Sequence, residues 1–132
     1  MMPIRRINAH IVRTRGWQSG TDIEDHVACH LSGVFRAEEV SQQHRVGRYR
    51  IDFAWPDVMI GLEVDGWYHR SPMAAARDAE RDANLRAQGW LILRIDDRGG
   101  WDVLDDQLGR VCRVVHALRR NGDSRHYVRR GP

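Results

Sequence analysis

The stretch from Tyr49 to His69, YRIDFAWPDVMIGLEVDGWYH, constrains the fold of this 132-residue chain more than any other segment. Two runs rich in β-branched and aromatic residues flank Pro56-Asp57-Val58, so the stretch is predicted to be two antiparallel strands joined by a tight turn. If Pro56 pairs with Met59 across this turn, Trp55 pairs with Ile60. A longer turn would shift the pairing but keep the same faces together.

That register brings acidic side chains together on one face. Asp52 pairs with Glu63, and Asp65 follows two residues later on the same face, beside Arg50. The opposite face is predicted to hold Ile51, Phe53, Trp55, Ile60, Leu62 and Val64. Directly paired residues have Cβ atoms about 4.5–5.5 Å apart, and like charges at that distance are destabilising. A cation between them would relieve the repulsion, and oxygen ligands suit Mg²⁺.

The length and charge of the chain suggest one domain with a mildly basic surface. A chain of this size forms a single core. The net charge is +3, every basic residue other than histidine is arginine, and five arginines follow from Arg119 onward. Arginine suits bidentate phosphate contacts, although an all-arginine choice is equally explained by genomic base composition.

The cysteines and the hydropathy pattern indicate an intracellular protein. Cys29 and Cys112 lie far apart in helical patterns, which predicts free buried thiols in a reducing cytoplasm. The first residues lack the long apolar run of a signal peptide, and no stretch is long enough to span a membrane. We therefore expect a cytoplasmic protein with no membrane partner.

Periodicity and end signals predict the order helix, three strands, helix, strand, helix. A capping box at Thr21 and Glu24 is expected to open the first helix, and Ser71-Pro72 to open the second. The predicted bounds are 21–36 for the first helix, 42–46, 49–55 and 58–65 for the strands, 73–88 for the second helix, 90–95 for the fourth strand and 103–120 for the last helix. The domain plan is an N-terminal arm over 1–20, a domain over 21–120 and a basic tail over 121–132.

Five motifs in this order resemble the PD-(D/E)XK nuclease superfamily, and within it most of all the very-short-patch-repair (Vsr-like) endonuclease group. They are Arg50-Ile51-Asp52-Phe53, Glu63-Val64-Asp65-Gly66, His69, Arg77-Asp78-x-x-Arg81-Asp82 and Gly89-Trp90. The resemblance implies an α/β, restriction-endonuclease-like core: a mixed four-stranded sheet flanked by helices. It also implies a DNA endonuclease that uses Mg²⁺, with Mn²⁺ as a substitute and no organic cofactor, in repair or in defence against foreign DNA.

The resemblance assigns the catalytic set Asp52, Glu63, Asp65 and His69. Asp52, Glu63, Asp65 and the backbone carbonyl of Val64 are the expected metal ligands. Asp65 stands where the superfamily usually has lysine, and His69 is the expected replacement as general acid or base. Glu24 is either an accessory acid near the metal or only the partner of Thr21 in the capping box.

The expected nucleic-acid contacts are Arg50, Arg77, Arg81, Trp67 and Tyr68. In this reading Arg81 points toward phosphate while Asp82 anchors neighbouring backbone or side chains. The alternative for the arginines of the 77–82 segment is a solvated ion-pair face. For the aromatic residues the alternative is partial burial in the core. His26 and His30 lie one helical turn apart and are interpreted as ordinary surface histidines.

Two other hypotheses remain open, the first because the usual lysine is missing and the chain is short, the second because a bare catalytic core often lacks a recognition element of its own. One is a catalytically inactive nuclease-fold module that binds DNA. The other is a subunit that needs a partner for recognition. A homodimer would allow both DNA strands to be cut, and nothing in the sequence selects a target.

Overall fold

A computed structural model of the chain describes residues 22–65 and 71–121. The elements are α2 (Asp22–Ser32), a 3₁₀ turn η1 (Ala37–Glu39), β1 (Ser41–Val46), β2 (Tyr49–Trp55), β3 (Ile60–Asp65), α3 (Pro72–Ala87), β4 (Leu91–Asp96) and α4 (Trp101–Arg120). The predicted α/β class and element order are confirmed. The expected arm over 1–20 and the tail beyond 121 lie outside the described residues, and the domain plan stays a prediction.

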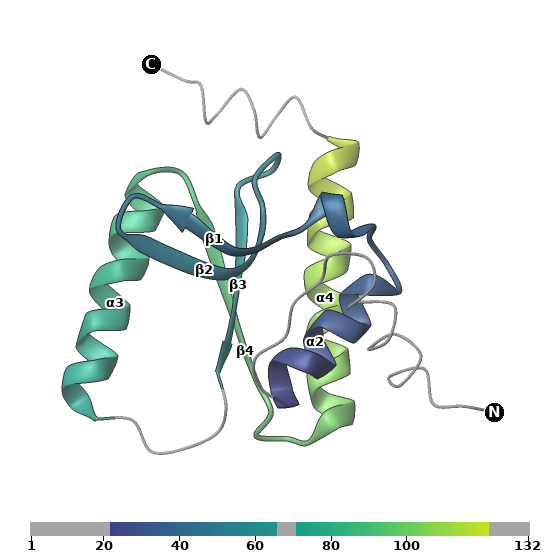
Figure 1. The fold of residues 1–132 in the computed structure, drawn as a ribbon, viewed down its shortest axis with the longest axis horizontal. Helices are drawn as coiled ribbons and strands as arrows, with labels where there is room; N and C mark the ends of the chain where they lie inside the picture. The colour runs from purple at the N-terminus through teal and green to yellow at the C-terminus, as the bar shows by residue number, and fades with distance from the viewer. Residues whose placement is uncertain (1–21, 66–70, 122–132) are drawn as a thin grey trace.

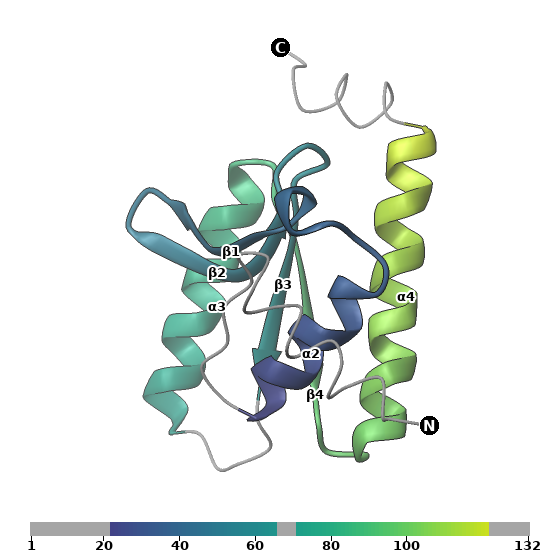
Figure 2. The same cartoon turned by 45° about the vertical axis from the view of Figure 1, so that its right-hand side comes forward.

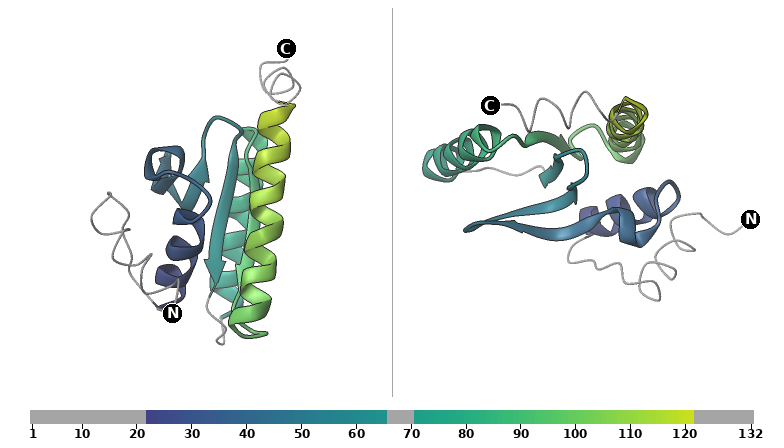
Figure 3. Two further views of the ribbon diagram at one scale, coloured as in Figure 1. Left: turned by 90° about the vertical axis from the view of Figure 1, so that its right-hand side faces the viewer. Right: turned by 90° about the horizontal axis from the view of Figure 1, so that it is seen from above.

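The four strands form one mixed sheet in the order β1-β2-β3-β4, antiparallel except for the parallel pair β3 and β4. Helices α2 and α4 lie on one side of this sheet and α3 lies on the other (Figure 1). The turned view shows α2 beginning at the end of the sheet where β3 finishes (Figure 2). The view from above shows β3 and β4 between the helices (Figure 3).

Local sequence signals explain several element ends. The Ser71 hydroxyl accepts a hydrogen bond from the Ala74 amide at 3.1 Å, as predicted for the start of α3. The chain leaves α3 through Gly89 with a φ of 100°, a conformation that glycine adopts without a steric penalty.

Three predicted ends were wrong by two residues or more, and one of them is the start of the last helix, which lies at Trp101 rather than Val103. The first helix stops at Ser32 rather than near Arg36, because the Phe35 amide bonds back to the Leu31 carbonyl at 2.8 Å and the chain turns. The third strand begins at Ile60 rather than Val58. The Val58 and Met59 amides close a turn, and Met59 has a φ of 54°.

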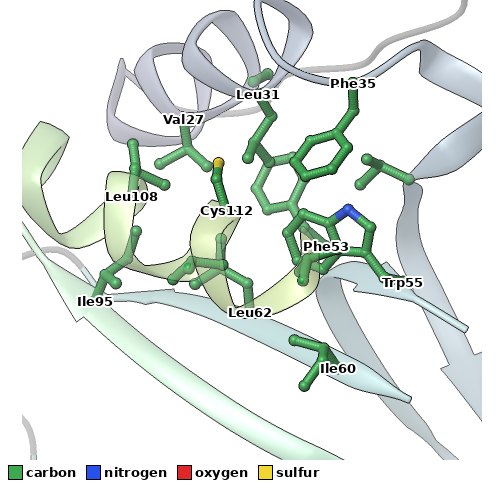
Figure 4. Packing of buried hydrophobic residues seen from close by; sticks show 14 of the residues in the cluster. Val27, Leu31, Phe35, Phe53, Trp55, Ile60, Leu62, Ile95, Leu108 and Cys112 are labelled. Atoms are coloured by element: carbon green, nitrogen blue, oxygen red, sulfur yellow. The ribbon is translucent and has the colours of Figure 1, made fainter. Parts of the chain in front are cut away.

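The larger core lies between the sheet and the pair α2 and α4. Phe35, Phe53 and Trp55 pack there with Leu62 and Cys112 (Figure 4). Cys29 and Cys112 are both free and buried, as predicted. This core holds one face of the sheet rigid behind the acidic residues.

A smaller core on the α3 side shows that one face assignment was wrong. Ile51 packs with Ala54, Leu85, Trp90 and Ile92, not with Phe53 and Trp55. From Phe53 onward the side chains alternate regularly, so the alternation changes phase at Asp52. The pairing of β1 with β2 also omits Gln43 and Asp52.

His26 is not a surface histidine, contrary to the interpretation above. It is buried, its Nε2 lies 2.6 Å from Asp105 Oδ1, and its ring stacks on Trp101 with centroids 4.5 Å apart. His30 Nδ1 lies 3.3 Å from the same Asp105 oxygen. These contacts join α2 to α4. Among the described helices, none combines the length and the apolar character needed to cross a bilayer.

Candidate active site

At the open end of the β2–β3 hairpin, hydrogen bonds to the Asp52 and Glu63 carboxylates take the place of backbone pairing between the two strands. Trp55 pairs with Ile60, as predicted, and the last regular pair is Phe53 with Leu62. Beyond it, the Asp52 amide donates to Glu63 Oε2 at 2.9 Å, and the Val64 amide donates to Asp52 Oδ2 at 2.9 Å. The two carboxylates thus lie across from each other, each bonded to the other strand.

Partial burial leaves the charge of Asp52 incompletely compensated. Desolvation raises the pKa of the Asp52 carboxyl, while the Val64 amide and the charge of Arg81 only partly offset it. The Gln43 side chain also bonds to Asp52. Gln43 has a φ of 50°, which is uncommon for a residue with a Cβ atom. The backbone of β1 is therefore strained directly opposite Asp52.

Arg81 from α3 reaches across to the hairpin. Its Nη2 pairs with Glu63 Oε1 and lies 3.5 Å from Asp82 Oδ1, and its Nη1 donates to the Arg50 carbonyl at 3.3 Å. Its Nε is buried and has no hydrogen-bond partner. Burial first, and then the neighbouring charge of Arg94, lower the pKa of Arg81.

Arg94 from β4 is held far better. Its Nε and Nη2 donate to the two oxygens of Asp82 at 3.0 and 3.1 Å, and its Nη1 donates to Asp65 Oδ2 at 3.0 Å. Burial opposes the charge, but Asp82 and Asp65 outweigh it and raise the pKa of Arg94. This guanidinium ties α3 to the ends of β3 and β4.

We call Asp52, Glu63, Asp65 and Asp82 the acidic cluster. Within the described part of the chain, two guanidinium groups, those of Arg81 and Arg94, face these four carboxylates. The carboxylate oxygens suit a divalent cation such as Mg²⁺. The arrangement itself is not ready for one: among residues 22–65 and 71–121, no three His, Cys, Asp or Glu side chains are grouped to hold a metal ion. Arg81 and Arg94 occupy carboxylate oxygens that a metal would use.

The remaining predicted site residues divide into two groups. Arg77 and Arg50 are exposed on α3 and β2, and Glu24 lies in the first turns of α2, at the end of the sheet where β3 finishes. Trp67, Tyr68 and His69 lie outside the described residues. The structure thus brings together Asp52, Glu63, Asp65 and Arg81 of the predicted set.

The sequence argument missed Arg94 and Gln43. Arg94 had a usable signal, because it is a single charge inside the apolar run Leu91–Ile95 and a buried charge needs a partner. Gln43 had none, since its role depends on a backbone conformation and on its place opposite Asp52.

Comparison with known proteins identifies the family. The model of REase_MTES_1575, a restriction endonuclease-like family, matches residues 24–118. The chain belongs to this family. The REase_MTES_1575 match spans every element from α2 to α4 and includes the whole acidic cluster. The expected nuclease superfamily is confirmed, and the Vsr-like placement stays a prediction.

Individual proteins are similar to parts of the chain. The chain is 42% identical over 53 residues to the uncharacterized protein YcjD of Escherichia coli K12, covering 40% of this chain and 44% of that protein. It is 33% identical over 76 residues to the uncharacterized protein Rv2248 of Mycobacterium tuberculosis H37Rv, covering 57% of this chain and 26% of that protein. The chain thus spans less than half the length of these relatives. Among solved structures, the catalytic domain of the homing endonuclease I-Bth0305I is similar with a TM-score of 0.48 and 19% identity, over 80% of this chain and 98% of that domain.

Proposed function

We propose that this chain is a divalent-metal-dependent endonuclease that hydrolyses DNA phosphodiester bonds. The observation that carries the proposal is the acidic cluster at the end of the β2–β3 hairpin, inside a restriction endonuclease-like family. Among the described residues, Glu63 and Asp82 are buried and Asp52 is partly buried, and carboxylates in such surroundings are costly to fold. The Vsr-like resemblance favours a setting in repair or in defence against foreign DNA.

Asp52 and Glu63 are the proposed metal ligands, with Asp65 and the Val64 carbonyl completing the set. A bound Mg²⁺ would polarise a phosphoryl oxygen and make a water molecule a better nucleophile. The protein's own contribution is to fix the two carboxylates across the hairpin through the Asp52 and Val64 amides. His69 is proposed to move the proton, and Glu24 is a possible accessory acid.

Two exposed arginines are proposed to bind the DNA backbone together with Arg81. Arg77 lies on α3, and Arg50 lies on β2 next to Asp52. Arg81 is the arginine already at the carboxylates. Trp67 and Tyr68 are proposed to contact bases by stacking.

A plasmid cleavage assay tests the proposal. Wild-type protein in Mg²⁺ or Mn²⁺ should nick or linearise supercoiled DNA, and EDTA should stop it. Asp52→Asn should lower the rate at least about a hundredfold, because it removes an anionic oxygen ligand. Asp106→Asn, an exposed acid on α4, is the matched control and should cleave normally. Absence of cleavage by the wild type, or equal cleavage by Asp52→Asn, would falsify the proposal.

One observation favours a second function, an inactive nuclease-fold module that only binds DNA. Asp65 stands at the usual lysine position and is already paired with Arg94. This alternative predicts salt-sensitive DNA binding that needs no divalent ion and survives Asp52→Asn. Gel-shift titrations in EDTA at two salt concentrations separate it from the enzyme.

A further inference from the structure

The two arginines of the acidic cluster are held in opposite ways. Arg94 places three nitrogens on carboxylate oxygens at 3.0 to 3.1 Å, and its pKa is raised. Arg81 keeps one buried nitrogen without a partner, bonds weakly to the Arg50 carbonyl, and has a lowered pKa. Arg94 is therefore held by two carboxylates, whereas Arg81 depends mainly on its ion pair with Glu63.

Glu63 is the main partner of Arg81 and also a proposed metal ligand. Glu63 Oε2 already accepts the Asp52 amide, so Oε1 is the oxygen that Arg81 covers. A cation that binds through Oε1 must displace the guanidinium. The freed Arg81 would then keep only Asp82 at 3.5 Å and the Arg50 carbonyl at 3.3 Å. Since its side chain is 20% exposed, solvent and a DNA phosphate lie within its reach.

We propose that Arg81 is an exchangeable counter-ion that couples the two ligands of this site. It neutralises Glu63 while no divalent cation is bound and turns to a DNA phosphate when a cation takes Glu63. Cation binding and DNA binding then strengthen each other through one side chain, and by linkage the two effects are equal. This inference rests on the proposed function and adds a coupling to it. Binding of the cation raises the affinity for DNA, and binding of DNA raises the affinity for the cation.

Calorimetric titration of Mn²⁺ into the DNA-free protein gives the first test. Arg81→Met should bind Mn²⁺ about fivefold more tightly than wild type, because the competing cation is gone. Arg86→Met, an exposed arginine on the same helix, removes the same charge and should change the affinity less than twofold. Equal or weaker Mn²⁺ binding by Arg81→Met overturns the proposal.

DNA affinity gives the second test, with Ca²⁺ as the probe cation. Fluorescence anisotropy should show wild-type protein binding a DNA duplex about tenfold more tightly in Ca²⁺ than in EDTA. Arg81→Met should lose this enhancement, and Arg86→Met should keep it. An enhancement that survives in Arg81→Met contradicts the coupling role.

The wild-type protein supplies a third test that does not depend on a variant folding. With ¹⁵N-labelled arginine, Mg²⁺ alone should move the Arg81 Nε–H signal towards the position of exposed arginines, and the Arg94 signal should stay. An unmoved Arg81 signal at saturating Mg²⁺ overturns the proposal. The two proposals fail differently. Absence of any metal binding removes the proposed function, whereas metal binding and cleavage with an unmoved Arg81 remove only this inference.

Discussion

At the scale of single residues, several groups of the site lower the stability of the folded protein. Asp52 is partly buried without an arginine hydrogen-bonded to it, and Gln43 opposite it has a left-handed backbone. The Nε atom of Arg81 is buried and has no hydrogen-bond partner. Such features concentrate where a protein has traded stability for function.

Asp52→Asn should therefore stabilise the protein while it abolishes cleavage. Burial raises the pKa of Asp52, so the folded state disfavours its charge at neutral pH, and an amide keeps an acceptor for the Val64 amide. We expect a gain of about 1 kcal/mol, or about 4 °C in Tm, at pH 7.5 in EDTA.

The pH dependence follows from the sign of that shift. Because the folded pKa lies above the ordinary 3.8, the folded state binds the proton more tightly, and protonation favours folding. The Tm difference between Asp52→Asn and wild type should be fully present above the raised pKa and shrink as the pH falls through it. Asp106→Asn is the control. A variant less stable than wild type at pH 7.5 would contradict this account.

The Cys112 thiol should be protected in the folded protein. Burial raises its pKa from 9.0 to about 11, which leaves about fiftyfold less thiolate near pH 9 than an unfolded chain has. Iodoacetamide at that pH should label Cys112 quickly in urea and at least about fiftyfold more slowly without it, as measured by peptide mass spectrometry. Equal labelling in both conditions would show that the thiol is accessible.

At the scale of elements, the face of the sheet that contacts α3 is apolar at one end and charged at the other. Its apolar half holds Ile51, Leu85 and Ile92 near the start of β3, and its charged half holds Glu63 and Arg94 near the end. Alternation along β3 and β4 predicts which residues share this face. It could not predict the place of Ile51, because the phase change at Asp52 depends on contacts with Gln43 and Val64 that come from other strands.

Gly61 marks the closest approach in the apolar half. A Cβ atom there would lie 2.8 Å from Ile92 Cδ1 and 2.9 Å from Ile51 Cγ2. Gly61→Ala should thus cost about 2 kcal/mol by overpacking a central strand. Gly109→Ala is the matched control: on α4 the nearest atom is the flexible Arg113 Nη1 at 3.4 Å, and alanine should stabilise the helix by about 1 kcal/mol. Urea unfolding of both variants measures the difference, and a loss at Gly109 equal to that at Gly61 would refute the packing argument.

At the scale of the whole molecule, the sequence predicted the order of elements because each one carries its own periodicity and end signals. The place of Asp52 opposite Glu63 was predictable because it depends on the hairpin alone, whereas Arg81 on α3 was predicted through the family resemblance. Contacts between distant segments were not predictable. His26 and Asp105 are 79 residues apart, and Asp82 and Arg94 meet only because α3 packs on β4. No local pattern specifies such pairs.

Arg119 is the clearest case, because it was counted with the basic C-terminal residues and instead joins three segments. It donates to Asp57 in the β2–β3 turn at 2.7 and 3.1 Å and to Glu39 in η1 at 3.0 Å, and it lies over the Phe35 ring.

Arg119→Ala should lower the free energy of unfolding by about 1.5 kcal/mol. The loss is smaller than that expected for a buried ion-pair network, because Asp57 is half exposed. The exposed Arg120→Ala removes the same charge and should cost less than about 0.5 kcal/mol. Urea unfolding at low and high salt checks both values, since screening should shrink only the Arg119 effect. Equal losses for the two variants would mean that Arg119 does not hold α4 against the hairpin turn.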